Sequence, residues 1–166
     1  DVVVVGSGNG ALTAALCSHD GGAKTLVIEK SDQFGGTSAT SGGGVWIPNN
    51  RYAKAENVDD STEDARDYIN SVSPPGKIKD ELVETYLSEA PKMIDYLHEN
   101  SQVKYRNLAH YPDYFPDNPG GKAGNRSMEP EPIYGTKLGK DLGKLREQHP
   151  QTAFTMGPIN MNFTQV

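Results

Sequence analysis

The chain has 166 residues, a formal net charge of −6, 35% hydrophobic residues and a single cysteine. This length fits one ordinary domain, and its acidic and basic residues are interspersed without a basic stripe, which argues against a nucleic-acid partner. No apolar run reaches 18 residues, so we expect no transmembrane helix. The lone cysteine excludes an internal disulfide and suits a reducing compartment, so we expect a cytoplasmic protein.

The first predicted element is a strand that turns sharply into a helix. Val2–Val5 is an uncharged run of β-branched residues, which is typical of a strand buried on both faces in a parallel sheet. The glycines after it permit a tight turn and let a ligand approach the backbone. A helix of small residues runs to about Cys17, and the partial positive charge of its N-terminus would face an anionic ligand. The turn consists of Gly6, Ser7, Gly8, Asn9, Gly10 and Ala11.

A second apolar run, Thr25–Ile28, ends in Glu29, which lies 23 positions after Gly6. In dinucleotide-binding units of the G-x-G-x-x-G/A type, an acid about 20 residues further on accepts hydrogen bonds from ribose hydroxyls. A glycine fingerprint alone is a weak signal, because any strand–turn–helix favours glycine. Here strand, fingerprint, second strand and acid occur in the expected order. The sequence therefore predicts a nucleotide site, and this unit alone fits either FAD or NAD.

A second glycine-rich segment, residues 35–44, favours FAD. A plain NAD domain would continue into another helix and strand, whereas this segment consists of glycine, serine, threonine and alanine. Such a segment can lie against a flat ring and offer N–H and hydroxyl donors. A flexible linker is the alternative, but residues 45–48 (Val-Trp-Ile-Pro) follow at once and should be packed. The further cofactor residues expected here are Lys30, Gly35, Gly36, Thr37, Ser38, Ser41, Gly42 and Gly43.

The middle of the chain alternates helical patterns with loops. Residues 51–60 read as a polar connection, and Ser61 is expected to cap a helix that ends before two prolines. A second helix begins near Ile78, and Pro91 is expected to start a further turn that ends by Asn100. We expect Cys17 to be buried in the first helix.

A loop of irregular structure is predicted for residues 110–121, after a short strand at residues 103–106. Three prolines and two glycines exclude regular structure there, and three aromatic residues fit the lining of a pocket for a flat hydrocarbon. A self-packed aromatic loop is the alternative. Residues 129–132 (Glu-Pro-Glu-Pro) are expected to form an extended, solvated connector, and residues 138–145 a short helix.

Several of these segments resemble flavoproteins of the fumarate reductase and succinate dehydrogenase superfamily. Within it, the 3-ketosteroid Δ1-dehydrogenases are the nearest look-alike. The resemblance covers the chain to about Leu145; its glycine-rich part is shared across the superfamily, whereas Trp-Ile-Pro-Asn-Asn and Tyr-Pro-Asp-Tyr are more specific. The matching segments are residues 10–13, 35–50, 60–66, 111–114, 119–122 and 124–130.

The resemblance implies an α/β fold, with a Rossmann-like FAD-binding βαβ unit followed by helices. Such flavoenzymes have two domains and are several times longer, so we expect this chain to be an incomplete part of one. We assign residues 1–50 to the FAD-binding βαβ unit and flavin loop. Residues 51–150 form a helical and loop region that contributes to the substrate pocket. Residues 151–166 stay unassigned, as a sheet segment or the start of the missing part.

The resemblance also implies the activity of a 3-oxosteroid 1-dehydrogenase. Such enzymes introduce a C1–C2 double bond into a 3-ketosteroid by proton abstraction at C2 and hydride transfer from C1 to flavin N5, and an external acceptor then takes the electrons. Tyr114 matches the tyrosine that hydrogen-bonds the proton-abstracting tyrosine. This partner matters because a phenol with a pKa of about 10 is a poor base at neutral pH. Tyr111 and Phe115 would line the substrate pocket.

Two other functions remain open. A relative that reduces fumarate-like diacids would need arginines to pair the carboxylates, and the five arginines of this chain are scattered. A flavin-binding module without its own chemistry is the second alternative. No metal is expected, because the four histidines lack metal-ligand spacing.

Overall fold

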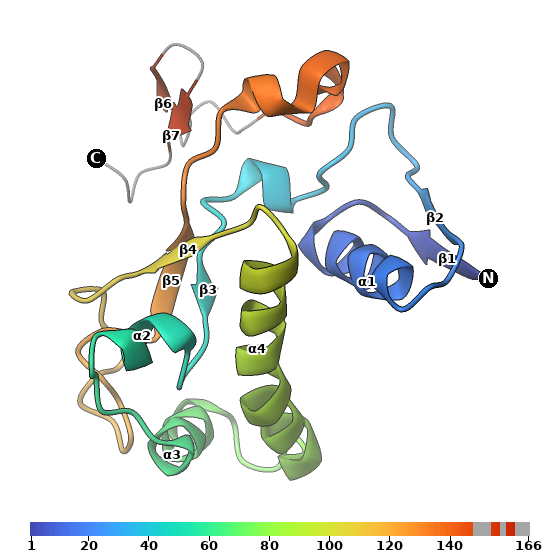
Figure 1. Ribbon diagram of the computed structural model, residues 1–166. Helices are drawn as coiled ribbons and strands as arrows, with labels where there is room; N and C mark the ends of the chain where they lie inside the picture. The colour runs from blue at the N-terminus through green and yellow to red at the C-terminus, as the bar shows by residue number, and fades with distance from the viewer. Residues whose placement is uncertain (148–153, 157–158, 162–166) are drawn as a thin grey trace. The chain divides into compact units, whose positions relative to one another are not determined.

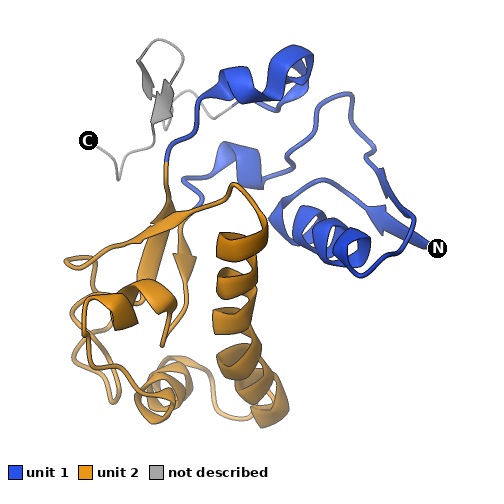
Figure 2. Cartoon of the chain, in the orientation of Figure 1, with its two compact units in different colours: residues 1–43, 132–166 blue, residues 44–131 orange. Residues whose placement is uncertain are grey.

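A computed structural model describes residues 1–147, 154–156 and 159–161 (Figure 1). The chain forms two compact units (Figure 2). Unit 1 consists of Asp1–Gly43 and Pro132–Val166, and unit 2 consists of Gly44–Glu131. The predicted α/β class is confirmed, and the three-part division by role stays a prediction.

Unit 1 begins with the predicted β–α–β arrangement. Strand β1 (Val2–Val5) pairs in parallel with β2 (Thr25–Ile28), from Val2 opposite Thr25 to Val5 opposite Ile28. Helix α1 (Asn9–Asp20) connects the two strands, as a parallel pair requires. The helix ends at Gly21, whose N–H donates to Cys17 O over 3.0 Å.

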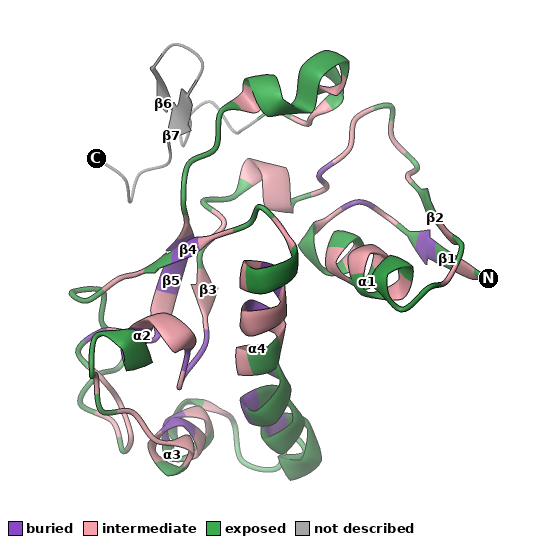
Figure 3. Ribbon diagram, viewed as in Figure 1, coloured by how far each residue is buried: buried purple, intermediate pink, exposed green. Residues whose placement is uncertain are grey.

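The predicted burial of β1 on both faces is wrong for the described residues. Val4 is buried, but Val3 and Val5 are 60% and 77% exposed, and Cys17 in α1 is exposed instead of buried (Figure 3). The physical reason is that this sheet has two strands and that α1 is the helix packed on both of them. Unit 1 therefore covers only part of the apolar surface of β1.

The rest of unit 1 contains short helical turns and a hairpin. The 3-10 turn η1 (Ser38–Thr40) lies in the second glycine segment, and η2 (Gly135–Lys144) replaces the short helix expected near residues 138–145. A kink at Gly139, with φ of 55°, divides η2 into two pieces. Strands β6 (Phe154–Met156) and β7 (Ile159–Met161) pair antiparallel; the other residues of the predicted tail 151–166 lie outside the described residues.

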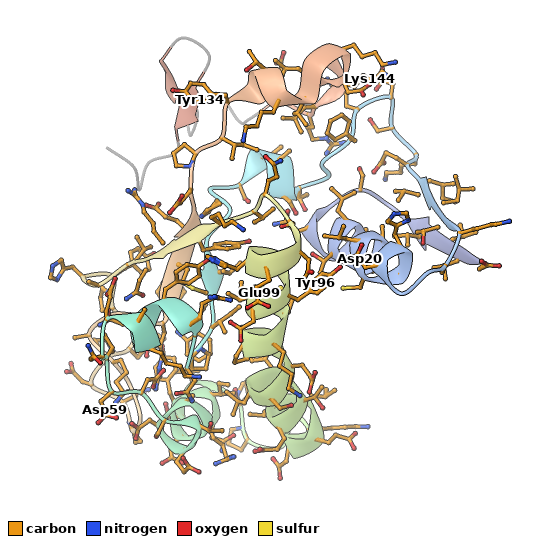
Figure 4. The ribbon with its side chains drawn as sticks, viewed as in Figure 1. Asp20, Asp59, Tyr96, Glu99, Tyr134 and Lys144 are labelled. Atoms are coloured by element: carbon orange, nitrogen blue, oxygen red, sulfur yellow. The ribbon has the colours of Figure 1, made fainter. Side chains whose placement is uncertain are left out.

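Lys144, at the end of η2, lies next to the turn that follows β2 (Figure 4). Phe34 N–H donates to Lys144 O and Arg146 N–H donates to Phe34 O, both over 2.9 Å. Phe34 and Leu145 thereby form a parallel β-bridge. These bonds fix residues from both sequence segments of unit 1 against each other.

Unit 2 is built on a three-stranded antiparallel sheet in the order β3-β5-β4. Its strands are β3 (Val45–Trp46), β5 (Ser127–Pro130) and β4 (Tyr105–Asn107). The expected packing after the glycine segment is confirmed, since Ile47 and Pro48 are buried. The main core cluster consists of Ile47, Ala90, Ile94, Tyr105 and Met128.

Strand β5 corrects the expectation of a solvated connector at residues 129–132 for the first two of them, whereas Glu131 and Pro132 are exposed as expected. Glu129 is 1% exposed and accepts a hydrogen bond of 2.6 Å from Arg106 Nε. The segment is extended as expected, but it pairs with a strand on each side, and this pairing buries its carboxylate. An arginine partner offsets the cost of burying the charge.

Three helices complete unit 2. Helix α2 (Arg51–Ala55) replaces the expected polar connection, and α3 (Thr62–Val72) has the predicted cap, because Ser61 Oγ accepts from Asp64 N–H over 2.9 Å. Helix α4 (Asp80–Asn100) is continuous through Pro91, where a new start was expected. Its buried face continues on both sides of the proline, so packing outweighs the missing hydrogen bond. That face consists of Val83, Leu87, Ala90, Ile94 and Leu97.

Candidate functional site

The turn between β1 and α1 forms the anion-binding geometry that its glycines predict. Gly6 adopts a φ of 100°, which glycine tolerates, and its N–H donates to Ile28 O over 2.7 Å. Among the described residues, no hydrogen-bond acceptor reaches the N–H groups of Gly10 and Ala11 in the first turn of α1. Two free N–H donors at a helix N-terminus suit the phosphates of a nucleotide.

The second glycine segment lies directly against this turn. A Cβ atom on Gly36 would stand 3.3 Å from Gly8 Cα, tighter than most real contacts, and Gly36 also has a positive φ of 56°. Asn9 N–H donates to Ser38 Oγ over 3.0 Å, and Gly35 N–H donates to Ser7 Oγ over 2.9 Å. The structure therefore brings together two segments that the sequence separates by about 30 positions.

Glu29 faces the same turn. Ser7 Oγ donates to Glu29 Oε2 over 2.5 Å, and Ser31 N–H donates to Oε1 over 3.1 Å. These hydrogen bonds, with the Ser7 bond the larger cause, hold the pKa of Glu29 below its ordinary value of 4.5. The group is therefore a carboxylate at neutral pH, and each oxygen keeps a lone pair for a ribose hydroxyl. Lys30 next to it is exposed.

The remaining predicted cofactor residues lie just before and after η1. Thr37 precedes that turn and is exposed. Ser41 Oγ donates to Ser38 O over 2.9 Å and accepts from Gly43 N–H over 3.1 Å, which fixes the end of the segment. Gly42 is exposed. This segment is thus a folded turn with small residues at its surface and not a flexible linker.

In unit 2, the aromatic loop is anchored through Asp113, a buried residue. Its Oδ1 accepts from Trp46 Nε1 over 2.6 Å. Its Oδ2 accepts from Lys122 N–H over 2.9 Å and from the Arg126 guanidinium over 3.0 Å. Asp113 N–H also donates to Lys122 O over 3.0 Å, so both its backbone and its side chain are held.

The aromatic side chains of this loop point outward. Tyr114 is 82% exposed, and Tyr111 and Phe115 are about half exposed. The self-packed loop is therefore not what the structure shows, while the roles of these three residues in a substrate pocket stay predictions. Among the described residues, no hydrogen bond reaches the Tyr114 hydroxyl.

Arg126 is the residue that the sequence did not reveal. It is 1% exposed and pairs with Asp60 over 2.7 Å and with Asp113 over 3.0 Å. Its guanidinium carbon also lies 5.6 Å from the Trp46 ring centroid and 5.9 Å from that of Tyr68, within reach of cation–π attraction. No spacing signal marks this cluster, because its members are up to 80 positions apart.

Within the described part of the chain, no group of three or more histidine, cysteine, aspartate or glutamate residues is arranged to hold a metal ion. No helix in the same residues is long and apolar enough to cross a membrane. Unit 1 offers hydrogen-bond donors and one carboxylate, which match the phosphates and ribose of a dinucleotide.

The chain matches the family described as FAD binding domain over residues 1–162. It belongs to that family. Its cofactor is accordingly FAD, as predicted, and the free N–H groups of α1 and the Glu29 carboxylate provide a donor and acceptor set that fits this dinucleotide. The resemblance to 3-ketosteroid Δ1-dehydrogenases is confirmed by the relatives of this FAD binding domain.

The 3-oxosteroid 1-dehydrogenase of Mycolicibacterium smegmatis is 38% identical over all of this chain and 29% of its own length. The 4-oxocyclohexanecarboxylate 2-dehydrogenase of Sinomonas cyclohexanicum is 37% identical over 94% of this chain and 27% of its own. A crystal structure of the 3-ketosteroid Δ1-dehydrogenase from Sterolibacterium denitrificans, in complex with 1,4-androstadiene-3,17-dione, matches with a TM-score of 0.86. That match has 42% identity and covers 92% of this chain and 27% of the other. The chain thus spans less than a third of the length of these relatives.

Proposed function

We propose that this FAD binding domain serves an FAD-dependent dehydrogenase that introduces a C1–C2 double bond into a 3-ketosteroid. The observation that carries the proposal is the match to the S. denitrificans enzyme, at 42% identity and a TM-score of 0.86. The match extends over 92% of this chain.

Unit 1 would hold the cofactor. The N–H groups of Gly10 and Ala11 would bind the pyrophosphate, Glu29 would accept hydrogen bonds from the adenosine ribose, and residues 35–43 would lie along the flavin. Bound FAD supplies the acceptor for the hydride that leaves C1. The chain's own contribution in this unit is to bind and orient the cofactor.

Unit 2 would contribute to the proton transfer through Tyr114. Its hydroxyl can donate a hydrogen bond to the group that abstracts the C2 proton, which stabilises the deprotonated form of that group and so makes it available as a base. Tyr111 and Phe115 would give an apolar substrate surface. The electron acceptor and the cytoplasmic location stay predictions.

A monocyclic keto acid is the second candidate substrate, because the Sinomonas relative is 37% identical over 94% of the chain. The two substrates share a ring ketone but differ in a carboxylate, which enzymes commonly pair with arginine. Four of the five arginines are committed to acids within the described residues; they are Arg51, Arg66, Arg106 and Arg126. Within the described residues this leaves Arg146 for a carboxylate, and the steroid is preferred because of the match to the S. denitrificans enzyme.

The test uses the full-length protein purified with its flavin. Under anaerobic conditions, 4-androstene-3,17-dione should bleach the flavin absorbance and yield a product two mass units lighter. In contrast, 4-oxocyclohexanecarboxylate should be a poorer reductant, and the reduced enzyme should not turn over fumarate. If the keto acid alone bleaches the flavin, or if fumarate is reduced, that compound and not the steroid is the substrate. An absence of flavin would refute the proposal as a whole.

A further inference from the structure

The buried cluster of Asp60, Asp113 and Arg126 in unit 2 holds the aromatic loop with more hydrogen bonds and ion pairs than a surface loop requires. Asp113 accepts three hydrogen bonds from three separate parts of the unit: β3 through Trp46, the returning end of the loop through Lys122, and the segment before β5 through Arg126. Because a carboxylate can accept from several donors at once, one side chain fixes the start of the aromatic loop in three directions.

Arg126 holds Asp113 against the scaffold. Its second partner, Asp60, is itself fixed by a 3.0 Å hydrogen bond from Asn49 N–H. All three charged groups are buried, so each depends on the others, because an unpaired buried charge is costly. The loop therefore cannot move away from the scaffold without separating buried charges.

Tyr114 is held on both sides by this arrangement. Asp113 precedes it, and the N–H group of Phe115 donates to the Tyr68 hydroxyl over 3.3 Å. The phenol between them has neither packing nor a hydrogen-bond partner within the described residues, and it is 82% exposed. The backbone from which the phenol extends is therefore constrained, which is a common feature of preorganised sites, whereas the rotamer of the phenol is set by the groups that it meets.

We propose that Asp113, clamped by Arg126 and Trp46, is a positioning residue for Tyr114 in the reaction. This inference rests on the proposed function and deepens it, because it assigns to the buried carboxylate the task of placing the Tyr114 hydroxyl at its hydrogen-bond partner. Asp113 acts through Tyr114 and contacts neither the substrate nor the flavin in this role.

The informative variant is Asp113→Asn. Its amide oxygen can still accept from Trp46 Nε1, but its NH2 group would then face two donors, Lys122 N–H and Arg126, and the loop must shift. Trp46→Phe is the milder second variant, since it removes one donor and keeps an aromatic ring beneath Arg126.

Two matched aspartate variants serve as controls. Asp60→Asn removes the charge of the second buried carboxylate that pairs with Arg126. It leaves every hydrogen bond between Asp113 and its partners in place, so it controls for lost stability. Asp95→Asn alters an exposed ion pair with Arg51 and controls for the amide change alone.

The experiment is a double-mutant cycle with Tyr114→Phe in the full-length flavoenzyme, with kcat, KM, the pH profile of kcat and the melting temperature measured for each variant. A displacement of about 1 Å costs on the order of 100-fold in rate, so we expect Asp113→Asn to lower kcat by roughly 10- to 100-fold, with KM little changed. It should shift the pH profile of kcat to higher pH, as Tyr114→Phe does. In the Tyr114→Phe background the same change should cost less than about threefold, since residues that act as a unit are not additive.

Asp60→Asn should lower the melting temperature as much as Asp113→Asn does, with a much smaller loss of kcat. The inference is overturned if the effects of Asp113→Asn and Tyr114→Phe on kcat multiply, or if kcat follows the melting temperature across all variants. If Asp113→Asn does not fold, Trp46→Phe carries the same cycle with a smaller expected effect. Failure of the proposed function looks different: the parent enzyme would then not dehydrogenate the steroid at all.

Discussion

The Ser7 hydroxyl donates a 2.5 Å hydrogen bond to Glu29 and accepts one of 2.9 Å from Gly35 N–H. One buried hydroxyl thereby connects the end of β1, the end of β2 and the second glycine segment. Each of these three segments has a predicted part in FAD binding. Ser7 therefore acts as their common fixed point, which the fingerprint pattern alone does not specify, since its second position accepts any residue.

Replacing Ser7 with alanine should weaken both the fold and the hold on FAD. The buried Gly35 N–H would lose its acceptor, at a cost of about 1–3 kcal/mol in the free energy of unfolding. Urea unfolding and flavin retention on gel filtration measure the two effects. The control Ser31→Ala keeps the backbone bond to Glu29 and removes a local acceptor of Gln33 N–H, which water can replace, so it should cost no more than about 1 kcal/mol; an equal loss in both variants would contradict the role of Ser7.

The lowered pKa of Glu29 predicts a loss of stability in acid. A carboxyl whose pKa is lower in the folded state stabilises the fold above its unfolded value, near 4.5, and this contribution disappears as the pH falls through the lower folded pKa. Between pH 7 and 5 the contribution should be constant. Glu29→Gln should flatten the acid limb of a plot of unfolding midpoint against pH. An unchanged acid limb would show that Glu29 is not paired with Ser7 in solution.

Gly8→Ala should separate folding from cofactor binding. Gly8 has a φ of −73°, which alanine adopts readily, and its added Cβ would meet only Ser38 Oγ at 3.5 Å, an ordinary contact. The protein should therefore unfold at the same urea concentration, yet lose most of its flavin absorbance, because the methyl group occupies the space of the pyrophosphate. Gly143→Ala, which meets nothing within 4 Å, should change neither property. Full flavin content in the Gly8 variant would place the pyrophosphate elsewhere.

Gly120→Ala should destabilise unit 2. A Cβ there would stand 1.9 Å from Asp64 O and 2.8 Å from Tyr68 N, both backbone atoms of α3, and φ is 72°. Overpacking against backbone atoms, added to the strained φ, should cost at least about 2 kcal/mol. Gly76→Ala has a similar φ of 69° but free space around it, so it should cost only about 1 kcal/mol. Thermal unfolding of both variants isolates the clash; equal shifts would show that the loop does not pack on α3.

Local chemistry explains how much of this fold was predictable. The Ser61 cap forms through a neighbour three positions away, and the Val2–Val5 strand and the glycine turn are marked by their local composition; each is found where the sequence predicts it. Helix α2 was missed although its signal was present: the Asn50 side chain accepts from Tyr52 N–H and Ala53 N–H. The prediction of a new helix start at Pro91 was wrong, because the packing of the buried face keeps α4 continuous through that proline.

The buried cluster of unit 2 could not be predicted in this way. Asp60, Asp113 and Arg126 are ordinary charged residues with no periodic spacing, and isolated charges usually lie on the surface. Only the folding of β3, β5 and the loop brings both aspartates within 3.0 Å of Arg126. The aromatic loop was recognised from its composition, whereas the residue that fixes it was not. Long-range partners of this kind leave no trace in local sequence.

The solvent-exposed valines of β1, Val3 and Val5, have a practical consequence. Among the described residues, the parallel ribbon of β1 and β2 has no strand on its outer edges, and its apolar side chains are also in contact with water. Such an edge is a template for intermolecular pairing. A protein sample limited to these 166 residues should therefore form oligomers or precipitate as its concentration rises, and lysine in place of Val3 or Val5 should keep it monodisperse in light scattering.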